Sequence, residues 1–148
     1  MEFTDFNEII IFAIEKEEMS CKFYSQASRI VKDKKVQDLC VWLSQEEKKH
    51  IQILKKFTED HDSHFLHQTL EESNWIDTKV IREIHSEMNL GNILILAIKH
   101  EKKSLDFYSK MSDYSKDGQC SELFGLLAKE EKKHLLKLNH TLSNFKDL

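Results

Sequence analysis

The chain has 148 residues, of which 22 are basic and 26 acidic, giving a net charge of −4 at pH 7. This length suits one domain, and the mixed charges leave no basic surface of the kind that binds nucleic acid. Its three cysteines (Cys21, Cys40 and Cys120) form no C-x-x-C pair. That pattern excludes an iron site built from four cysteines, gives no disulfide framework, and suits a reducing cytosol.

Hydrophobic spacing predicts four helices, at about 5–31, 34–58, 90–114 and 119–145. There is no proline and there are only three glycines, so little opposes helix formation. Apolar residues recur at steps of three or four in each segment, the pattern of an amphipathic helix. We expect Thr4 or Asp5 to cap the first helix and Asn89 or Asn92 the third.

The chain repeats itself without a gap when it is shifted by 84 residues. The block Glu-Glu-Lys-Lys-His at 46–50 recurs unchanged at 130–134, and Phe-Tyr-Ser at 23–25 recurs at 107–109. Two copies of one helical hairpin explain this. We therefore expect a single all-α domain over 1–148, a four-helix bundle of hairpins at about 4–58 and 90–146.

A crossover at about 59–89 has no counterpart in the repeat. A connection this long can run the length of a bundle, so the second and third helices need not be antiparallel neighbours. Its apolar residues suggest that it packs against the bundle, for instance as a short fifth helix. Its four histidines fit a solvated crossover better than metal ligands: His61, His64, His67 and His85.

Nothing in these residues predicts membrane association. The longest apolar stretches, 9–14 and 93–98, are far too short to span a bilayer. Glu2 and Asp5 stand where a signal peptide needs positive charge, so we expect a cytoplasmic protein.

Six polar residues lie inside the apolar stripes: Glu17, Glu47, His50, Glu101, Glu131 and His134. A buried carboxylate is costly unless it is paired, hydrogen-bonded or bound to metal, and four together repel one another and take up protons. No lysine or arginine lies on these stripes. Two divalent cations would balance the four negative charges.

The register of the hairpins brings these residues to one level. Glu17 lies about 15 residues before the first turn and the Glu47/His50 pair about 15 to 18 after it, so both are roughly equally far from the turn. Glu101 and the Glu131/His134 pair repeat this register. The spacing within Glu-x-x-His puts both side chains on one helix face.

One Glu from each of two helices and a Glu-x-x-His from each of the other two is the ligand set of di-iron carboxylate bundles. The Glu-x-x-His motif is common by composition alone. The signal is the matched glutamate 30 residues before each copy. A metal-free bundle that keeps a relic of the site is the alternative.

Several neighbours of these ligands are expected to face solvent: Glu15, Glu18, Glu46, Glu130, His100 and His140. Glu18, Glu46 and Glu130 each lie about 100° around the helix from a ligand, and Glu15 lies about 200° from Glu17. Cys21 fits a small core residue better than a metal ligand. Tyr24 and Tyr108, two turns beyond a ligand glutamate, either donate hydrogen bonds to the carboxylates or find other partners in the core.

The pattern Ala-Ile-x-x-Glu-x5-Phe-Tyr at 13–24 and 97–108, with the two Glu-Glu-Lys-Lys-His blocks, resembles the rubrerythrin-like branch of the ferritin-like superfamily. The resemblance covers nearly the whole chain except the crossover. It implies a ferritin-like bundle with two iron ions per chain, for which manganese or zinc could substitute. It also implies reduction of hydrogen peroxide in defence against oxidative stress.

Two departures from that family stand out. Rubrerythrins proper carry a rubredoxin domain whose four cysteines bind iron, and these 148 residues lack it, so we expect an external electron-donor protein. Rubrerythrins also carry an additional glutamate on the third helix. That position is Ser104 here, which leaves the site more symmetric.

The expected function is therefore reduction of hydrogen peroxide, or reaction with oxygen, by a homodimeric di-iron oxidoreductase. Glu17 and Glu101 would be terminal or shifting ligands and Glu47 and Glu131 would bridge the metals. His50 and His134 would each anchor one metal. Three alternatives stay open: a ferroxidase or iron-handling protein of ferritin or bacterioferritin type, a non-enzymatic bundle that senses metal or oxygen, and a di-iron oxygenase.

Overall fold

A computed structural model describes residues 6–61 and 88–146. They form four helices: α1 Phe6–Ile30, α2 Lys34–Asp60, α4 Leu90–Tyr114 and α5 Gly118–Lys146. The all-α prediction is confirmed, and the predicted helix ends are correct to within two residues. The predicted caps Thr4 and Asp5, the suggested fifth helix and three crossover histidines lie outside the described residues: His64, His67 and His85.

Side chains at the turns satisfy the free N–H groups with which these helices begin. Asp33 precedes α2, and its Oδ1 accepts a hydrogen bond from the Val36 amide at 3.0 Å. Asn89 precedes α4 and accepts from the Asn92 amide at 2.8 Å, so Asn89 is the cap of the two predicted candidates. The Asp117 carboxylate serves the start of α5 in the same way.

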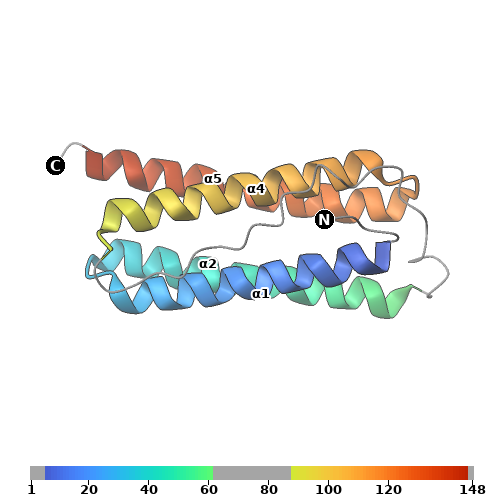
Figure 1. Ribbon diagram of the computed structural model, residues 1–148, viewed down its shortest axis with the longest axis horizontal. Coiled ribbons are helices and arrows are strands. Elements are labelled where there is room, and N and C mark those ends of the chain that lie inside the picture. Colours follow the sequence, from blue (N-terminus) through green and yellow to red (C-terminus); the bar gives the residue numbers. More distant parts are fainter. Residues whose placement is uncertain (1–5, 62–87, 147–148) are drawn as a thin grey trace.

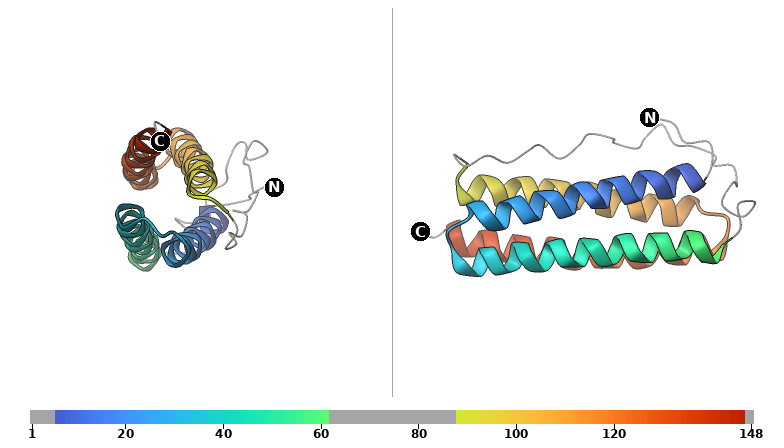
Figure 2. Two further views of the ribbon diagram at one scale, coloured as in Figure 1. Left: turned by 90° about the vertical axis from the view of Figure 1, so that its left-hand side faces the viewer. Right: turned by 90° about the horizontal axis from the view of Figure 1, so that it is seen from below.

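The helices form two antiparallel hairpins that pack face to face (Figure 1). Seen end-on they make a square in which α1 lies beside α4 and α2 beside α5 (Figure 2). α2 ends at one end of the bundle and α4 begins at the other, so these two helices run parallel and lie diagonally opposite. The prediction that they need not be antiparallel neighbours is confirmed. No helix in the described ranges is long and apolar enough to cross a membrane.

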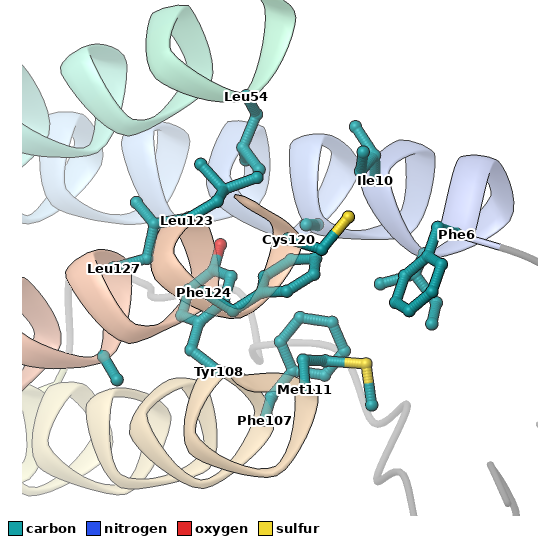
Figure 3. Close-up of a cluster of buried hydrophobic side chains, with 13 residues drawn as sticks. Phe6, Ile10, Leu54, Phe107, Tyr108, Met111, Cys120, Leu123, Phe124 and Leu127 are labelled. Carbon is teal, nitrogen blue, oxygen red and sulfur yellow. The ribbon is translucent and has the colours of Figure 1, made fainter. Parts of the chain in front are cut away.

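Two apolar clusters fill the core, one toward each end of the bundle. The first contains Phe6, Leu54, Met111 and Phe124 (Figure 3). The second contains these residues among others: Phe23, Val31, Val36, Ile93 and Leu138. Burying each large apolar side chain stabilises the fold by about 1.5–3 kcal/mol. This apolar packing above and below allows a layer of costly polar groups in the middle of the bundle.

Candidate metal centre

The polar layer brings together all six side chains that the sequence singled out. α1 supplies Glu17, α4 supplies Glu101, and α2 and α5 each supply a Glu-x-x-His pair. Their exposed fractions are between 0% and 3%. Ionisable groups are rarely buried so completely unless something compensates their charge.

The six side chains form two overlapping sets in which the ligand atoms lie within 4.8 Å of one another. One set is Glu17, Glu47, His50 and Glu131, and the other is Glu47, Glu101, Glu131 and His134. Each set has a carboxylate and an imidazole of its own. Glu47 and Glu131 belong to both sets, the position that bridging carboxylates between two metal ions would occupy.

Contacts within the two sets match, as the repeat requires. The Nδ1 atom of His50 lies 3.0 Å from Glu131 Oε1 and 3.5 Å from Glu17 Oε1. The Nδ1 atom of His134 lies 3.0 Å from Glu47 Oε1 and 3.7 Å from Glu101 Oε2. The two imidazole rings stack with centroids 5.4 Å apart and planes 7° from parallel. The centre therefore has approximate two-fold symmetry.

Many ligand atoms at this centre are buried without a hydrogen-bond partner. They include both imidazole Nδ1 atoms and at least one oxygen of each carboxylate. Buried polar atoms are nearly always satisfied, so such a cluster of acceptors calls for positive charge between them. Carboxylate and imidazole donors suit iron, manganese and zinc. The residues present thus fit a pair of metal ions.

The pKa values of the four carboxylates are shifted because these side chains are buried close to one another. Burial, followed by repulsion from the other glutamates, raises the pKa of Glu47 and of Glu131 well above the usual range. Burial also opposes ionisation of Glu17, but its interactions with Glu47 and His50 outweigh burial and lower the pKa of Glu17 to about 2. The pKa of Glu101 is lowered in the same way. A metal ion that binds Glu47 and Glu131 would therefore have to compete with protons.

Two tyrosines reach across from one hairpin to the ligands of the other. The Tyr24 hydroxyl on α1 donates a 2.6 Å hydrogen bond to Glu101 on α4. The Tyr108 hydroxyl on α4 donates one of the same length to Glu17 on α1. Of the two alternatives for these residues, the structure selects hydrogen bonds to the carboxylates. Such contacts orient the oxygens that face a metal.

A lysine reaches the neighbourhood of the site, although no lysine or arginine lies on the apolar stripes themselves. Lys16 lies one residue before Glu17, and its Nζ donates a 2.7 Å hydrogen bond to Ser104 Oγ on α4. The long side chain reaches inward between α1 and α4, where its charge acts on the glutamates. Burial lowers the pKa of Lys16, while attraction to the glutamates opposes that shift.

His100 was wrongly predicted, because its side chain is buried and not at the surface. It contacts Ser20 Oγ through Nε2, and burial lowers its pKa to about 4. His100 and Ser20 stand to each other as Lys16 and Ser104 do, since the shift of 84 residues exchanges the two pairs. Both pairs lie where α1 faces α4, so Lys16 and His100 both point into the interface between the two hairpins.

The remaining neighbours mostly follow expectation. Glu15, Glu18 and His140 are exposed, as predicted. Glu46 and Glu130 are half-buried and pair with lysines one turn along, and a Glu130 oxygen lies within 4.8 Å of both ligand histidines. Half-buried Cys21 donates its Sγ hydrogen to the Ser44 carbonyl, as befits a structural residue.

Comparisons with known proteins agree with this architecture. A protein of Thermotoga maritima, whose description assigns it to the ferritin-like diiron-carboxylate proteins, matches with a TM-score of 0.84 and 20% identity over 97% of each chain. The bacterioferritin-related protein of Bacteroides fragilis, described as a dodecameric thioferritin, has a TM-score of 0.73 and 15% identity. That match covers 93% of this chain and 84% of the other. At these identities the likeness establishes the fold. No curated protein matches the sequence. The Rubrerythrin family model matches residues 8–142, so the chain belongs to the rubrerythrin family.

Proposed function

We propose that the six buried side chains bind two iron ions and that the protein is an oxidoreductase that reduces hydrogen peroxide. The observation that supports this most is the pair of overlapping ligand sets that share Glu47 and Glu131. A pair of bound ferrous ions supplies one electron from each metal, the two electrons that reduction of peroxide to water requires.

The symmetry of the site suggests the role of each residue. Glu17 and Glu101 each lie in one set, so they are the terminal ligands, and Glu47 and Glu131 are the bridges. His50 and His134 present Nδ1 to the carboxylates and anchor one metal each. Tyr24 and Tyr108 hold the two terminal carboxylates in place.

The reaction consumes electrons, and no cysteine cluster that could carry an iron–sulfur site lies within these 148 residues, so we infer that the electrons reach the centre from outside them. We propose a one-electron carrier as the donor. A homodimer in the cytoplasm is the working expectation for assembly and location.

Two measurements test the metal centre. Anaerobic loading with ferrous iron should give two ions per chain, and anomalous diffraction across the iron and manganese edges should identify the native metal. Glu17→Gln should lose at least one ion, while Glu18→Gln, on the exposed neighbour, should keep both. Well under one ion per chain in the unaltered protein would contradict the assignment.

Stopped-flow oxidation of the di-ferrous protein tests the reaction itself. At matched concentrations, hydrogen peroxide should oxidise the centre faster than oxygen does, and no mineral should accumulate. Light scattering belongs to the same experiment, because iron storage needs a shell of many subunits. Faster reaction with oxygen, together with a shell that loads iron far beyond two ions per chain, would favour the ferritin-type alternative.

A further inference from the structure

One aromatic residue breaks the two-fold symmetry of the centre. The Trp42 ring on α2 packs edge-on against the His134 imidazole, with centroids 5.4 Å apart and planes at 77°. The shift of 84 residues places Leu126 at the equivalent position on α5. By the same symmetry, Leu126 stands to His50 as Trp42 stands to His134. Among residues 6–61 and 88–146, therefore, His134 has an indole ring beside it and His50 has none.

Trp42 also links the centre to the surface. Its ring is half-buried, and the Nζ atom of exposed Lys137 lies 4.2 Å from the ring centroid. His134 itself is fully buried. Lys137, Trp42 and His134 thus form a continuous line of contacts from the outer surface of the α2/α5 pair to the ligand layer.

Exposed lysines lie around this line, although the chain as a whole carries −4. We define the basic face as the four exposed lysines that helical spacing places on the same side of α2 and α5 as Trp42: Lys49, Lys129, Lys133 and Lys137. Glu46 and Glu130 neutralise two of them.

We propose that this basic face is the docking site of the electron donor, an acidic one-electron carrier protein, and that Trp42 conducts the electron to His134. The inference rests on the proposed function, since it requires a reducible metal pair. Complementary charge steers a carrier of opposite sign to this face. Electron tunnelling falls steeply with distance across non-bonded gaps, and the contact of Trp42 with His134 shortens the gap from the surface.

The electron count balances with two docking events. Each carrier is oxidised by one electron and leaves. Two such transfers supply the two electrons that hydrogen peroxide consumes, with two protons from solvent, as its O–O bond breaks to give two molecules of water.

The first test measures reduction of the oxidised, iron-loaded protein by reduced ferredoxin, a small acidic iron–sulfur protein. We expect Trp42→Leu, which copies the residue of the other half-site, to slow this reduction by at least about tenfold. Reduction by dithionite and the iron content should stay unchanged. Trp42→Phe, which retains a ring, should keep most of the rate. Equal rates in Trp42→Leu and the unaltered protein would overturn the conducting role of Trp42.

A reciprocal variant separates conduction from a structural effect. Adding Leu126→Trp to Trp42→Leu moves the indole to the side of His50, and 47%-exposed Leu126 leaves room for it. This double variant should recover the ferredoxin-dependent rate. A rate as low as that of Trp42→Leu alone would count against the route.

The docking surface has its own control. Lys129→Gln/Lys137→Gln should lower the bimolecular rate with ferredoxin by about tenfold at low salt, and the difference should shrink at high salt. The matched variant Lys99→Gln/Lys102→Gln, on exposed α4 positions, should change little. Equal loss in both pairs would contradict docking here. A changed particle mass by light scattering, with a salt-independent rate, would identify this face as a contact between copies and overturn the proposal.

A separate experiment tests the proposed peroxide reduction independently of electron entry. Dithionite-reduced protein is mixed with peroxide in the absence of ferredoxin. If peroxide fails to oxidise it while the Trp42 and lysine variants behave as expected, electron entry stands and peroxide reduction falls. If peroxide oxidises the reduced protein normally but the Trp42 and lysine variants change no rate, peroxide reduction stands and the proposed route of electron entry falls.

Discussion

Tyr24 on the first hairpin and Glu101 on the second are joined by a 2.6 Å hydrogen bond, and Tyr108 and Glu17 repeat this bond in the opposite direction. Each hairpin thus donates a hydrogen bond to a glutamate of the other that we propose as a terminal metal ligand. Because both bonds cross the interface between hairpins, correct docking of the hairpins and correct placement of the ligands depend on each other.

Removing either tyrosine hydroxyl should weaken both features. We expect Tyr24→Phe and Tyr108→Phe each to lower metal affinity by about 10–100-fold, since lost ligand-orienting contacts have effects of that size. Each should also lower the free energy of unfolding by about 1.5–3 kcal/mol, as for hydrogen bonds to charged groups. Chelator competition and urea unfolding measure these quantities. Because the bonds are equivalent, a large loss in only one of the two variants would contradict the symmetric arrangement.

Replacing a bridging carboxylate should affect the metal-bound and metal-free forms differently. Glu131→Ala should lose at least one ion and lower the thermal stability of the metal-bound protein, because metal that binds only the folded state stabilises it. At 100 times the dissociation constant, that stabilisation is about 2.7 kcal/mol per site. The metal-free protein should change little or gain stability, because the substitution relieves repulsion among carboxylates.

Exposed Glu122 on the same helix supplies the control for that comparison. Glu122→Ala should leave both forms unchanged in calorimetry. Equal destabilisation of the metal-free and metal-bound forms by Glu131→Ala would assign Glu131 an ordinary structural role.

The stability of the metal-free protein should depend on pH in an unusual direction. The pKa of Glu47 and of Glu131 is raised in the folded state, so their contribution is fully present below the unfolded value of 4.5 and is lost as pH rises. Burial lowers the pKa of His50, but its interactions with Glu17 outweigh burial and raise that pKa above its ordinary value of 6.5. The stability that His50 contributes is therefore also lost as the pH rises above 6.5. The metal-free protein should therefore melt at a higher temperature near pH 5.5 than near pH 8.

The metal-bound protein should show the opposite trend, because protons compete with metal for the ligands. Glu47→Gln, which mimics the protonated side chain, should make the melting temperature of the metal-free form depend less on pH. Below pH 4.5 the sign reverses, since Glu17 has a lowered pKa of about 2 and its contribution is lost as it gains a proton. Thermal melts of metal-free protein that are equally stable from pH 5.5 to 8 would contradict this picture.

The sequence predicted the helices and the meeting of the six polar residues because both follow from short-range rules. Helical spacing places each residue on a helix face, and hairpin register places Glu17 level with the Glu47/His50 pair. Buried charge on an apolar stripe then signals metal. None of these steps depends on which helix of one hairpin lies beside which helix of the other.

The missed features all depend on that choice of neighbours. His100 is buried and Lys16 reaches Ser104 only because α1 faces α4. Trp42 meets His134 only because α2 lies beside α5. The repeat relates Lys16 to His100 and Ser20 to Ser104, but it does not pair either base with a serine of the other hairpin. Tertiary packing supplies that pairing.

Lys16 provides the last test, because its charge acts on the proton affinity of a bridging ligand. Burial and neighbouring carboxylates raise the pKa of Glu131, and Lys16 partly offsets that rise. In Lys16→Gln the proton on Glu131 should be held more tightly, so metal should bind more weakly at acidic pH. At alkaline pH, where Glu131 is ionised, the variant should bind at least as tightly, because a cation that repels the metal is gone. Affinity measured against pH should thus give a curve displaced to higher pH that meets or crosses that of the unaltered protein. Lys22→Gln, on the exposed side of α1, should leave the curve in place. Weaker binding at every pH would show that Lys16 supports the fold and does not tune the centre.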